Sequence, residues 1–183
     1  SWEGESKAHA FGVKLMDDGR YPAGAAAEIW AQVAEERKAS AAARRKKYRD
    51  RSSSAVSTHP PTQMRMKDLA ESAAEIQPPS SDGVRFDDGR DAWRAAIAPI
   101  RASLIEEQVK LNDPGASLYL VNALAQDGWD STLRYFEGEV YRLRDETGDT
   151  DRAAQAFAAA VEFPDAMPEA HRAHGYALLK AGE

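Results

Sequence analysis

The sequence predicts an all-α fold, and three observations lead to that prediction. Alanine is abundant and β-branched residues are sparse, which favours helix over strand. Apolar residues recur three and four positions apart along most of the chain, as they do on the buried face of a helix. Glycine and proline stand where these patterns stop. We therefore expect a series of short helices joined by tight turns.

The composition excludes several classes of protein. A length of 183 residues suits one domain or one and a half small ones, and 43% apolar with 30% charged residues is ordinary for a globular protein. No stretch reaches the ~18 apolar residues that a membrane-spanning helix needs. The absence of cysteine excludes disulfides, thiolate metal sites and cysteine nucleophiles. A net charge of -6 argues against nucleic-acid binding by the whole chain.

One basic segment departs from this acidic average. Between Arg37 and Arg51, arginine and lysine are frequent and Asp50 is the single acid. One interpretation is the solvated end of a helix. The other is a contact with anionic lipid head groups at a membrane surface or with an acidic partner. The sequence leaves both open.

The first 77 residues carry the patterns of three helices. The first is expected over about 1–17 and ends near Gly19, which suits a left-handed cap. The second follows Pro22, and Thr62 can cap the third. The apolar residues expected on the inner faces are Ala8, Phe11 and Leu15, then Ala26, Ile29, Trp30 and Val33, then Met66, Leu69, Ala73 and Ile76.

A segment rich in Pro, Ser, Asp and Gly then predicts a linker over 78–90, between parts at 1–77 and 91–183. Five helical segments are expected beyond it, the first of them kinked at Pro99. Their expected inner-face residues are Trp93, Ile97, Ile100 and Leu104; Leu118, Val121 and Ala125; Leu133, Phe136, Val140 and Leu143; Ala153, Ala156, Phe157 and Ala160; and Ala170, His174, Ala177 and Leu178.

Residues 138–164 carry a spacing of small and aromatic residues that resembles the tetratricopeptide repeat. A small residue, Gly138, lets two paired helices approach, and Tyr141 fills the gap beside it. The rest of the pattern is two alanines against which the helices nest, a phenylalanine between hairpins and a terminating proline: Ala153, Ala160, Phe157 and Pro164. The resemblance implies antiparallel helical hairpins over 91–183, cut off within a further repeat, with a groove for a polypeptide substrate or partner. Ordinary helix-bundle packing is the alternative.

Three segments of the first 77 residues carry a second resemblance. Residues 1–12 read S-W-E-G-E-S-K-A-H-A-F-G, residues 19–22 read G-R-Y-P, and residues 57–69 read S-T-H-P-P-T-Q-M-R-M-K-D-L. They resemble an S-R-E-x-E-x-E-A-D-x-x-G helix, a G-Y-x-P turn and an S-T-H-P-P-T-x-x-R-x-x-x-L segment. These three motifs occur in the C-terminal half of the peptidase domain of a gluzincin family. The family comprises bacterial periplasmic zinc proteases fused to tetratricopeptide repeats and related to the CAAX prenyl endopeptidases.

This resemblance implies a zinc metalloendopeptidase that hydrolyses peptide bonds with a metal-activated water. A catalytic zinc takes three protein ligands and keeps one position open. In this family two ligands are the histidines of H-E-x-x-H, whose Glu is the general base, and the third is a later Glu. That third position is Glu5. His9, where the family usually has Asp, shares the same helix face and is a candidate catalytic residue. His59, presented before Pro60, is a second candidate, with a loop-bracing histidine as the alternative.

No H-E-x-x-H motif occurs in the chain, whose four histidines are His9, His59, His171 and His174. We therefore expect the chain to be part of a longer periplasmic or membrane-associated bacterial protein whose preceding part carries the motif. By itself this part should lack zinc and activity. The alternative is a non-catalytic peptide-binding scaffold with a degenerate peptidase remnant, since Trp2, Lys7 and His9 replace the family's usual Arg, Glu and Asp.

Overall fold

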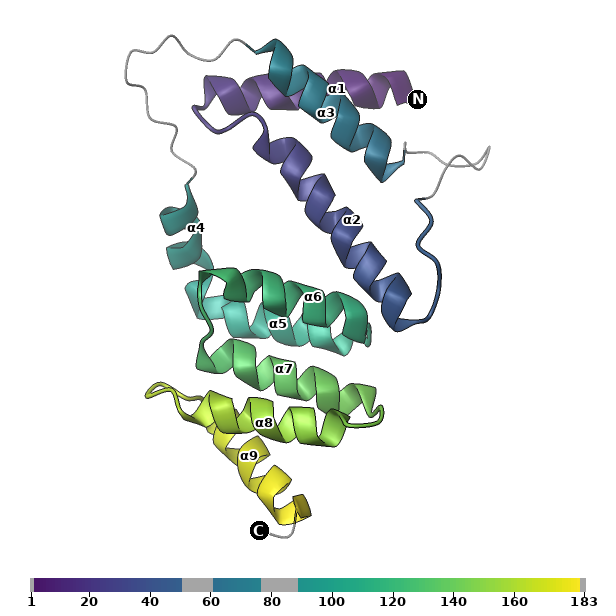
Figure 1. The fold of residues 1–183 in the computed structure, drawn as a ribbon. Helices are drawn as coiled ribbons and strands as arrows, with labels where there is room; N and C mark the ends of the chain where they lie inside the picture. Colours follow the sequence, from purple (N-terminus) through teal and green to yellow (C-terminus); the bar gives the residue numbers. More distant parts are fainter. Residues whose placement is uncertain (1, 51–60, 77–88, 182–183) are drawn as a thin grey trace. The chain divides into compact units, whose positions relative to one another are not determined.

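A computed structural model describes residues 2–50, 61–76 and 89–181, and in these ranges the protein is all-α, as predicted (Figure 1). Within the same ranges no helix is long and apolar enough to cross a membrane. The helices are α1 (Trp2–Asp18), α2 (Ala25–Ala43), α3 (Thr62–Glu75), α4 (Arg90–Ile97), α5 (Arg101–Lys110), α6 (Pro114–Leu124), α7 (Ser131–Arg144), α8 (Asp149–Val161) and α9 (Pro168–Ala181).

The chain divides into two compact units. The first unit comprises Ser1–Lys38 with Lys47–Ala96, and the second unit comprises Ala39–Lys46 with Ile97–Glu183. Of the linker expected over 78–90, all but the last two residues lie outside the described ranges.

In the first unit, α1 packs against α3, and each helix buries an aliphatic side chain: Val13 in α1 and Leu69 in α3. The inner face expected for α1 was wrong, because Phe11 is 63% and Leu15 54% exposed. The buried face of α1 instead carries Val13 together with two polar contacts. Glu5 forms an ion pair with α3, and the Ser6 hydroxyl donates a hydrogen bond of 2.8 Å to Asp68 on the same helix.

The other two inner faces of the first unit are partly as predicted. Met66 and Ala73 of α3, and Ile76 directly after it, are half-buried, and Leu69 is buried. In α2, Trp30 and Val33 are half-buried, but Ile29 is exposed, contrary to prediction, and Ala34 is the buried residue. The burial of α2 is thus displaced by one position along part of the helix.

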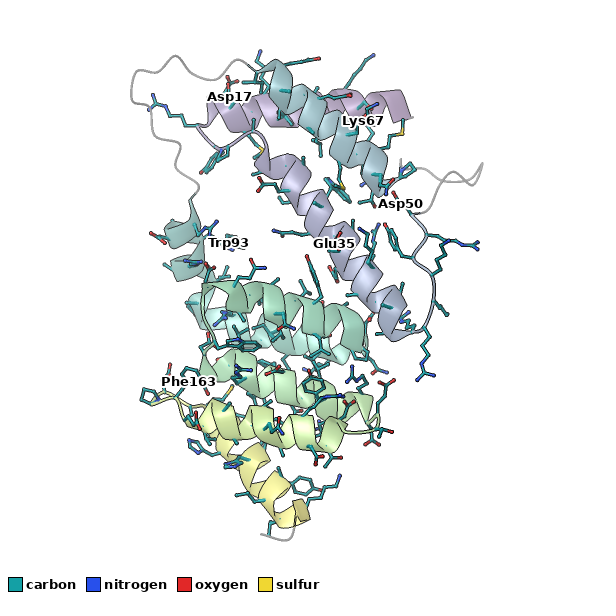
Figure 2. The ribbon with its side chains drawn as sticks, in the orientation of Figure 1. Asp17, Glu35, Asp50, Lys67, Trp93 and Phe163 are labelled. Carbon is teal, nitrogen blue, oxygen red and sulfur yellow. The ribbon has the colours of Figure 1, made fainter. Side chains whose placement is uncertain are left out.

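The N-terminus of α3 is capped from a distance. Helix α3 begins at Thr62, but the hydroxyl of this residue does not cap it. The Asp50 carboxylate accepts hydrogen bonds from the backbone amides of Thr62 and Gln63 at 3.1 and 2.8 Å, and it lies at this end of the helix (Figure 2). The Thr62 hydroxyl instead accepts a hydrogen bond of 2.8 Å from Arg37. A carboxylate satisfies the free amides and suits the positive end of the helix dipole, so two residues of the basic segment have local roles.

The second unit has its main core where α5, α6 and α7 meet. The buried residues of this core are Ile105, Val109, Val121, Leu133, Phe136 and Val140. The stripe expected along α4 and α5 was wrong: Trp93, Ile100 and Leu104 are largely exposed. The predicted break at Pro99 explains the change of face, because Ala98–Ile100 form a 3-10 turn with fewer residues per turn than the α-helix. The buried face of α5 therefore continues with Ile105 and Val109 in place of Leu104.

Helices α7 and α8 form a hairpin whose contact depends on one glycine. A Cβ atom added at Gly138 would lie 2.4 Å from Cε1 of Phe157, which is buried. The structure thus confirms the predicted helix crossing at Gly138. All four inner-face residues expected in α8 are buried: Ala153, Ala156, Phe157 and Ala160. In α7 the last expected residue, Leu143, is instead half-exposed near the helix end.

The turn between α7 and α8 is held by a buried carboxylate. Asp149 accepts two hydrogen bonds from Arg144 at 2.6 and 2.7 Å, one from Arg152 at 2.9 Å, and one from the Glu146 amide at 3.0 Å. The Arg144 guanidinium is the main cause that holds the pKa of this carboxyl well below its usual range. Two residues of the turn, Asp145 and Gly148, adopt positive φ angles of 52° and 82°. The end of α7 and the start of α8 are therefore fixed by one charged network.

Candidate functional site

Two of the three site residues predicted from the sequence lie together in the first unit. Glu5 and His9 are one turn apart on α1, with 3.9 Å between His9 Nε2 and Glu5 Oε1. The same Glu5 oxygen lies 2.7 Å from Nη2 of Arg65 on α3. The three side chains are only 19%, 17% and 13% exposed, in the order Glu5, His9, Arg65. The third predicted residue, His59, lies outside the described residues.

An aromatic ring holds the arginine of this cluster in place. The centre of the Arg65 guanidinium is 4.4 Å from the centroid of the Trp30 ring on α2, in cation–π geometry. A guanidinium that stacks on a ring while it pairs with a carboxylate has few remaining orientations. Three helices therefore fix the position of the Glu5 carboxylate: α1 carries it, α3 supplies its cation, and α2 supplies the surface on which that cation rests.

One polar atom of the cluster has no partner. His9 Nδ1 is buried and makes no hydrogen bond in the part of the chain that the structure describes. Buried polar atoms are nearly always paired. This nitrogen is thus available for a further hydrogen-bond partner beside Glu5.

The cluster alone does not provide the ligand set of a catalytic zinc. The described residues contain no group of three His, Cys, Asp or Glu side chains that could hold a metal ion, and a catalytic zinc needs three protein ligands. Glu5 does suit one such ligand, because ligating carboxylates are typically oriented by an outer hydrogen-bond partner, as Arg65 is here. Of the three protein ligands that a catalytic zinc needs, the described residues therefore suit one.

Sequence reasoning did not assign a role to Arg65 or Trp30. Arg65 is the arginine of the S-T-H-P-P-T-x-x-R segment, and its place in that motif is the signal from which a role could have been predicted. Trp30 carries an apolar pattern that predicts a core residue. Its use as a stacking surface depends on an approach of α2 and α3 that residue spacing does not reveal.

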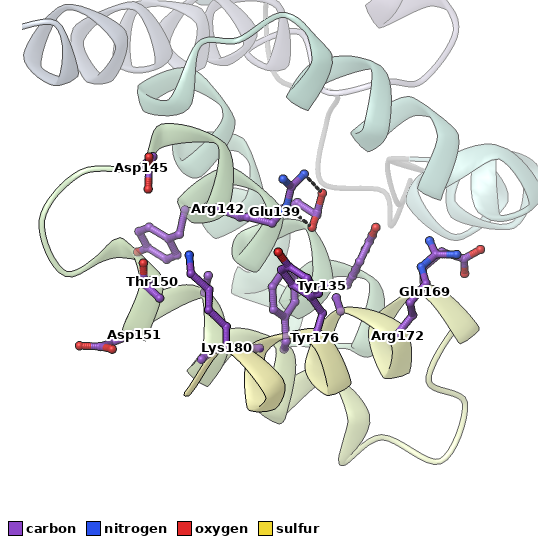
Figure 3. Close-up of a pocket in the computed structure, with 16 residues that line it drawn as sticks. Tyr135, Glu139, Arg142, Asp145, Thr150, Asp151, Glu169, Arg172, Tyr176 and Lys180 are labelled. Atoms are coloured by element: carbon purple, nitrogen blue, oxygen red, sulfur yellow. Dashed lines mark hydrogen bonds and ion pairs between the residues drawn. The ribbon is translucent and has the colours of Figure 1, made fainter. Parts of the chain in front are cut away.

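A second candidate site is a groove of about 720 Å³ in the second unit, formed by α7, α8 and α9 (Figure 3). Its α7 side presents Tyr135, Glu139 and Arg142, and its α9 side presents Arg172, Tyr176 and Lys180, among others. Alanines of α8 and α9 and the ring of Phe157 also line it. This volume lies within the range of ligand-binding clefts.

The polar side chains along this groove divide into paired and unpaired groups. Arg142 is bound by Glu139 through two hydrogen bonds of 2.9 and 2.7 Å, drawn as dashed lines in Figure 3. Arg172 and Lys180 form no ion pair with any residue that the structure describes. Burial is the main cause that raises the pKa of Tyr135, and the nearby Glu139 adds to it.

Comparison with known proteins gave one family match, and it covers the segment that contains the first of these sites. Residues 1–73 match the model of peptidase family M48. The matched segment is related to a family of metallopeptidases, and it contains Glu5, His9 and Arg65. Peptidases of this family are generally zinc-dependent. Comparisons with curated proteins and with solved structures gave no match.

Proposed function

We propose that this chain is the C-terminal part of a zinc-dependent metalloendopeptidase, followed by helical repeats that bind protein substrates or partners. The observation that carries the proposal is the M48 match over 1–73, together with the largely buried Glu5 carboxylate that Arg65 orients. Residues 1–73 are less than half of the chain, so the match supports the peptidase part alone.

In this proposal Glu5 is the third metal ligand. The H-E-x-x-H motif is absent from these 183 residues, so a longer protein has to supply the other two ligands and the general base. Zinc, when bound, would lower the pKa of a water molecule and so generate the nucleophile for peptide-bond hydrolysis. Glu5 contributes a negative charge whose direction is fixed by Arg65 and Trp30. His9 and His59 are the proposed candidates for proton handling beside it.

The second part of the proposal assigns the tetratricopeptide-like helices to polypeptide binding. The supporting observations are the contact between Gly138 and Phe157, the buried alanines of α8 and the groove formed with α9. Repeat hairpins of this kind commonly bind extended or helical peptides along such grooves. The groove would present a substrate or partner protein to the peptidase.

A non-catalytic scaffold is the second candidate function. Two observations favour it: His9 stands where the family usually has Asp, and Arg65 already pairs with a Glu5 oxygen. In that case the ion pair would hold α1 to α3 and no metal would be bound. The repeat groove would then be the functional part of the chain.

The cellular location of the protein is proposed from the family resemblance alone. We assign the protein to the bacterial periplasm or its membrane surface, with the basic segment at 37–51 as the membrane contact. Arg37 donates a hydrogen bond to Thr62, Lys38 pairs with Glu35 at 2.6 Å, and Arg44 lies 2.8 Å from Asp113, so the contact would depend mainly on the remaining cations. Co-sedimentation with phosphatidylglycerol vesicles but not with phosphatidylcholine vesicles would support it, and equal recovery with both would contradict it.

The complete protein that contains this chain provides the test of function. We expect it to retain about one zinc ion per chain through purification and to cleave casein, with cleavage abolished by a chelator and restored by zinc. The isolated 183-residue chain should do neither. A complete protein that is metal-free and inactive but binds peptides would favour the scaffold.

A further inference from the structure

The groove between α7, α8 and α9 carries a charge pattern that identifies its ligand more closely than a polypeptide in general. We propose that it binds an extended polypeptide segment with two acidic side chains, which pair with Arg172 and Lys180 on α9. The inference rests on the proposed peptide-binding role of the repeats and adds the chemistry of the peptide.

The two cations lie on one face of α9, with an aromatic ring between them. Arg172, Tyr176 and Lys180 are four residues apart in turn, so successive side chains point to the same side of the helix. In Figure 3, Tyr176 lies in the middle of the groove, and Arg172 and Lys180 lie toward its opposite ends. Neither cation has an ion pair within the described residues. Both are therefore free to meet a ligand.

The acids that line the groove differ in how far their charge is offset. Glu139 is neutralised by its two hydrogen bonds to Arg142. Asp151 and Glu169 lie in the first turns of α8 and α9, where the positive end of the helix dipole offsets part of their charge. Asp145, in the turn after α7, is the remaining acid. On the α9 side two cations, Arg172 and Lys180, stand against one acid, Glu169, so the net charge of that side is positive.

The rest of the lining suits the backbone and apolar side chains of an extended chain. Alanines at 153, 154, 173 and 177 leave space that a larger side chain of a ligand can fill. Tyr135 and Tyr176 offer apolar rings with a polar end, which suits contact with a peptide. Eight residues of helix span about 12 Å, and an extended chain rises about 3.3 Å per residue. Acidic side chains about four residues apart would thus reach both cations.

Three fluorescein-labelled peptides test this inference by fluorescence anisotropy with the chain as it stands. They share one sequence of alternating leucine and glycine, and carry Asp, Asn or Lys at two positions four residues apart. We expect the Asp peptide to bind about tenfold more tightly than the Asn peptide, as charge-assisted hydrogen bonds predict, and to lose that advantage at high salt. The Lys peptide should bind most weakly.

Substitutions in the protein test whether these two cations, and not the overall charge of the protein, cause the preference for acidic peptides. Arg172→Gln with Lys180→Gln should remove most of the difference between the Asp and Asn peptides. Lys110→Gln on α5, outside the groove, is the control for loss of a surface cation, and it should change nothing. Asp145→Asn should strengthen Asp-peptide binding.

One blocking variant separates failure of this inference from failure of the peptide-binding role. Ala177→Trp fills the groove, and circular dichroism checks that it folds. If the Asp and Asn peptides bind equally and Ala177→Trp abolishes both, the acidic preference is wrong and the peptide-binding groove remains. Tighter binding of the Lys peptide would also overturn the acidic preference. If no peptide binds the unsubstituted chain, both proposals fail for this groove.

Discussion

The guanidinium of Arg65 lies 2.7 Å from the carboxylate of Glu5, across 60 residues of chain, and joins α3 to α1. The pair is largely buried, with side-chain exposures of 13% for Arg65 and 19% for Glu5. It orients α1 and fixes the residue that we propose as a metal ligand. This contact therefore contributes to both the packing and the proposed function of the first unit.

Replacing Arg65 by Leu should destabilise the first unit by about 2 kcal/mol, because the Glu5 carboxylate would lose the cation with which it is buried. Hydrogen exchange of the α1 and α3 amides is the measurement, since it reports on this unit separately from the second. Lys67→Leu is the control, because Lys67 is 72% exposed on the same helix and 3.7 Å from Glu71. Unchanged protection in Arg65→Leu would show that the ion pair does not hold the helices together.

Replacing Gly138 by Ala should destabilise the second unit by about 1–3 kcal/mol, because the new methyl group would overlap the Phe157 ring. The matched control is Gly175→Ala in α9, where an added Cβ has nothing within 4 Å. There the substitution should stabilise the helix by up to about 1 kcal/mol. Denaturant unfolding followed by circular dichroism measures both. If the two substitutions changed the free energy of unfolding by the same amount, or if Gly138→Ala stabilised the protein, the packing of α7 on α8 described here would be contradicted.

Acid should weaken the turn between α7 and α8 through Asp149. The hydrogen bonds from Arg144 hold its folded-state pKa below the unfolded value of about 3.9. A lowered pKa stabilises the folded state above that value, and the contribution is lost as the pH falls from about 4 toward the folded-state pKa.

Asp149→Asn should therefore cost about 1.5–3 kcal/mol at neutral pH and flatten the acid limb of the stability curve. Asp165→Asn, an exposed residue in the turn after α8, is the control and should leave that limb unchanged. Unfolding free energies between pH 3 and pH 7 measure both variants. An acid limb in Asp149→Asn as steep as that of the unsubstituted chain would rule out this source of acid sensitivity.

Local spacing was sufficient to predict the features that depend on it. Gly138, Phe157 and the alanines of α8 follow from a small-and-aromatic pattern within one hairpin, and the structure has them where expected. The face of α1 could not be predicted in this way, because hydrogen-bonded and ionic contacts with α3 orient it, and their partners lie about 60 residues away. The face of α5 was missed because the 3-10 turn at Pro99 changes the helical phase.

The candidate site was likewise predicted only in part. The resemblance singled out Glu5 and His9, and the structure brings them to one face of α1. It did not indicate that Arg65 and Trp30 would hold Glu5, since three separate helices have to meet for that. The distant cap that Asp50 provides for α3 was missed for the same reason. The role of His59 stays a prediction.

Glu5 is the proposed ligand of the catalytic metal, and zinc analysis of the complete protein carrying Glu5→Gln tests this role. Glu71→Gln on α3, where Glu71 is 64% exposed, is the matched control. We expect Glu5→Gln to lower the bound zinc and the casein cleavage about 10-fold to 100-fold or more while circular dichroism stays unchanged, and the control to match the unsubstituted protein. Full zinc content and full activity in a folded Glu5→Gln protein would contradict the claim.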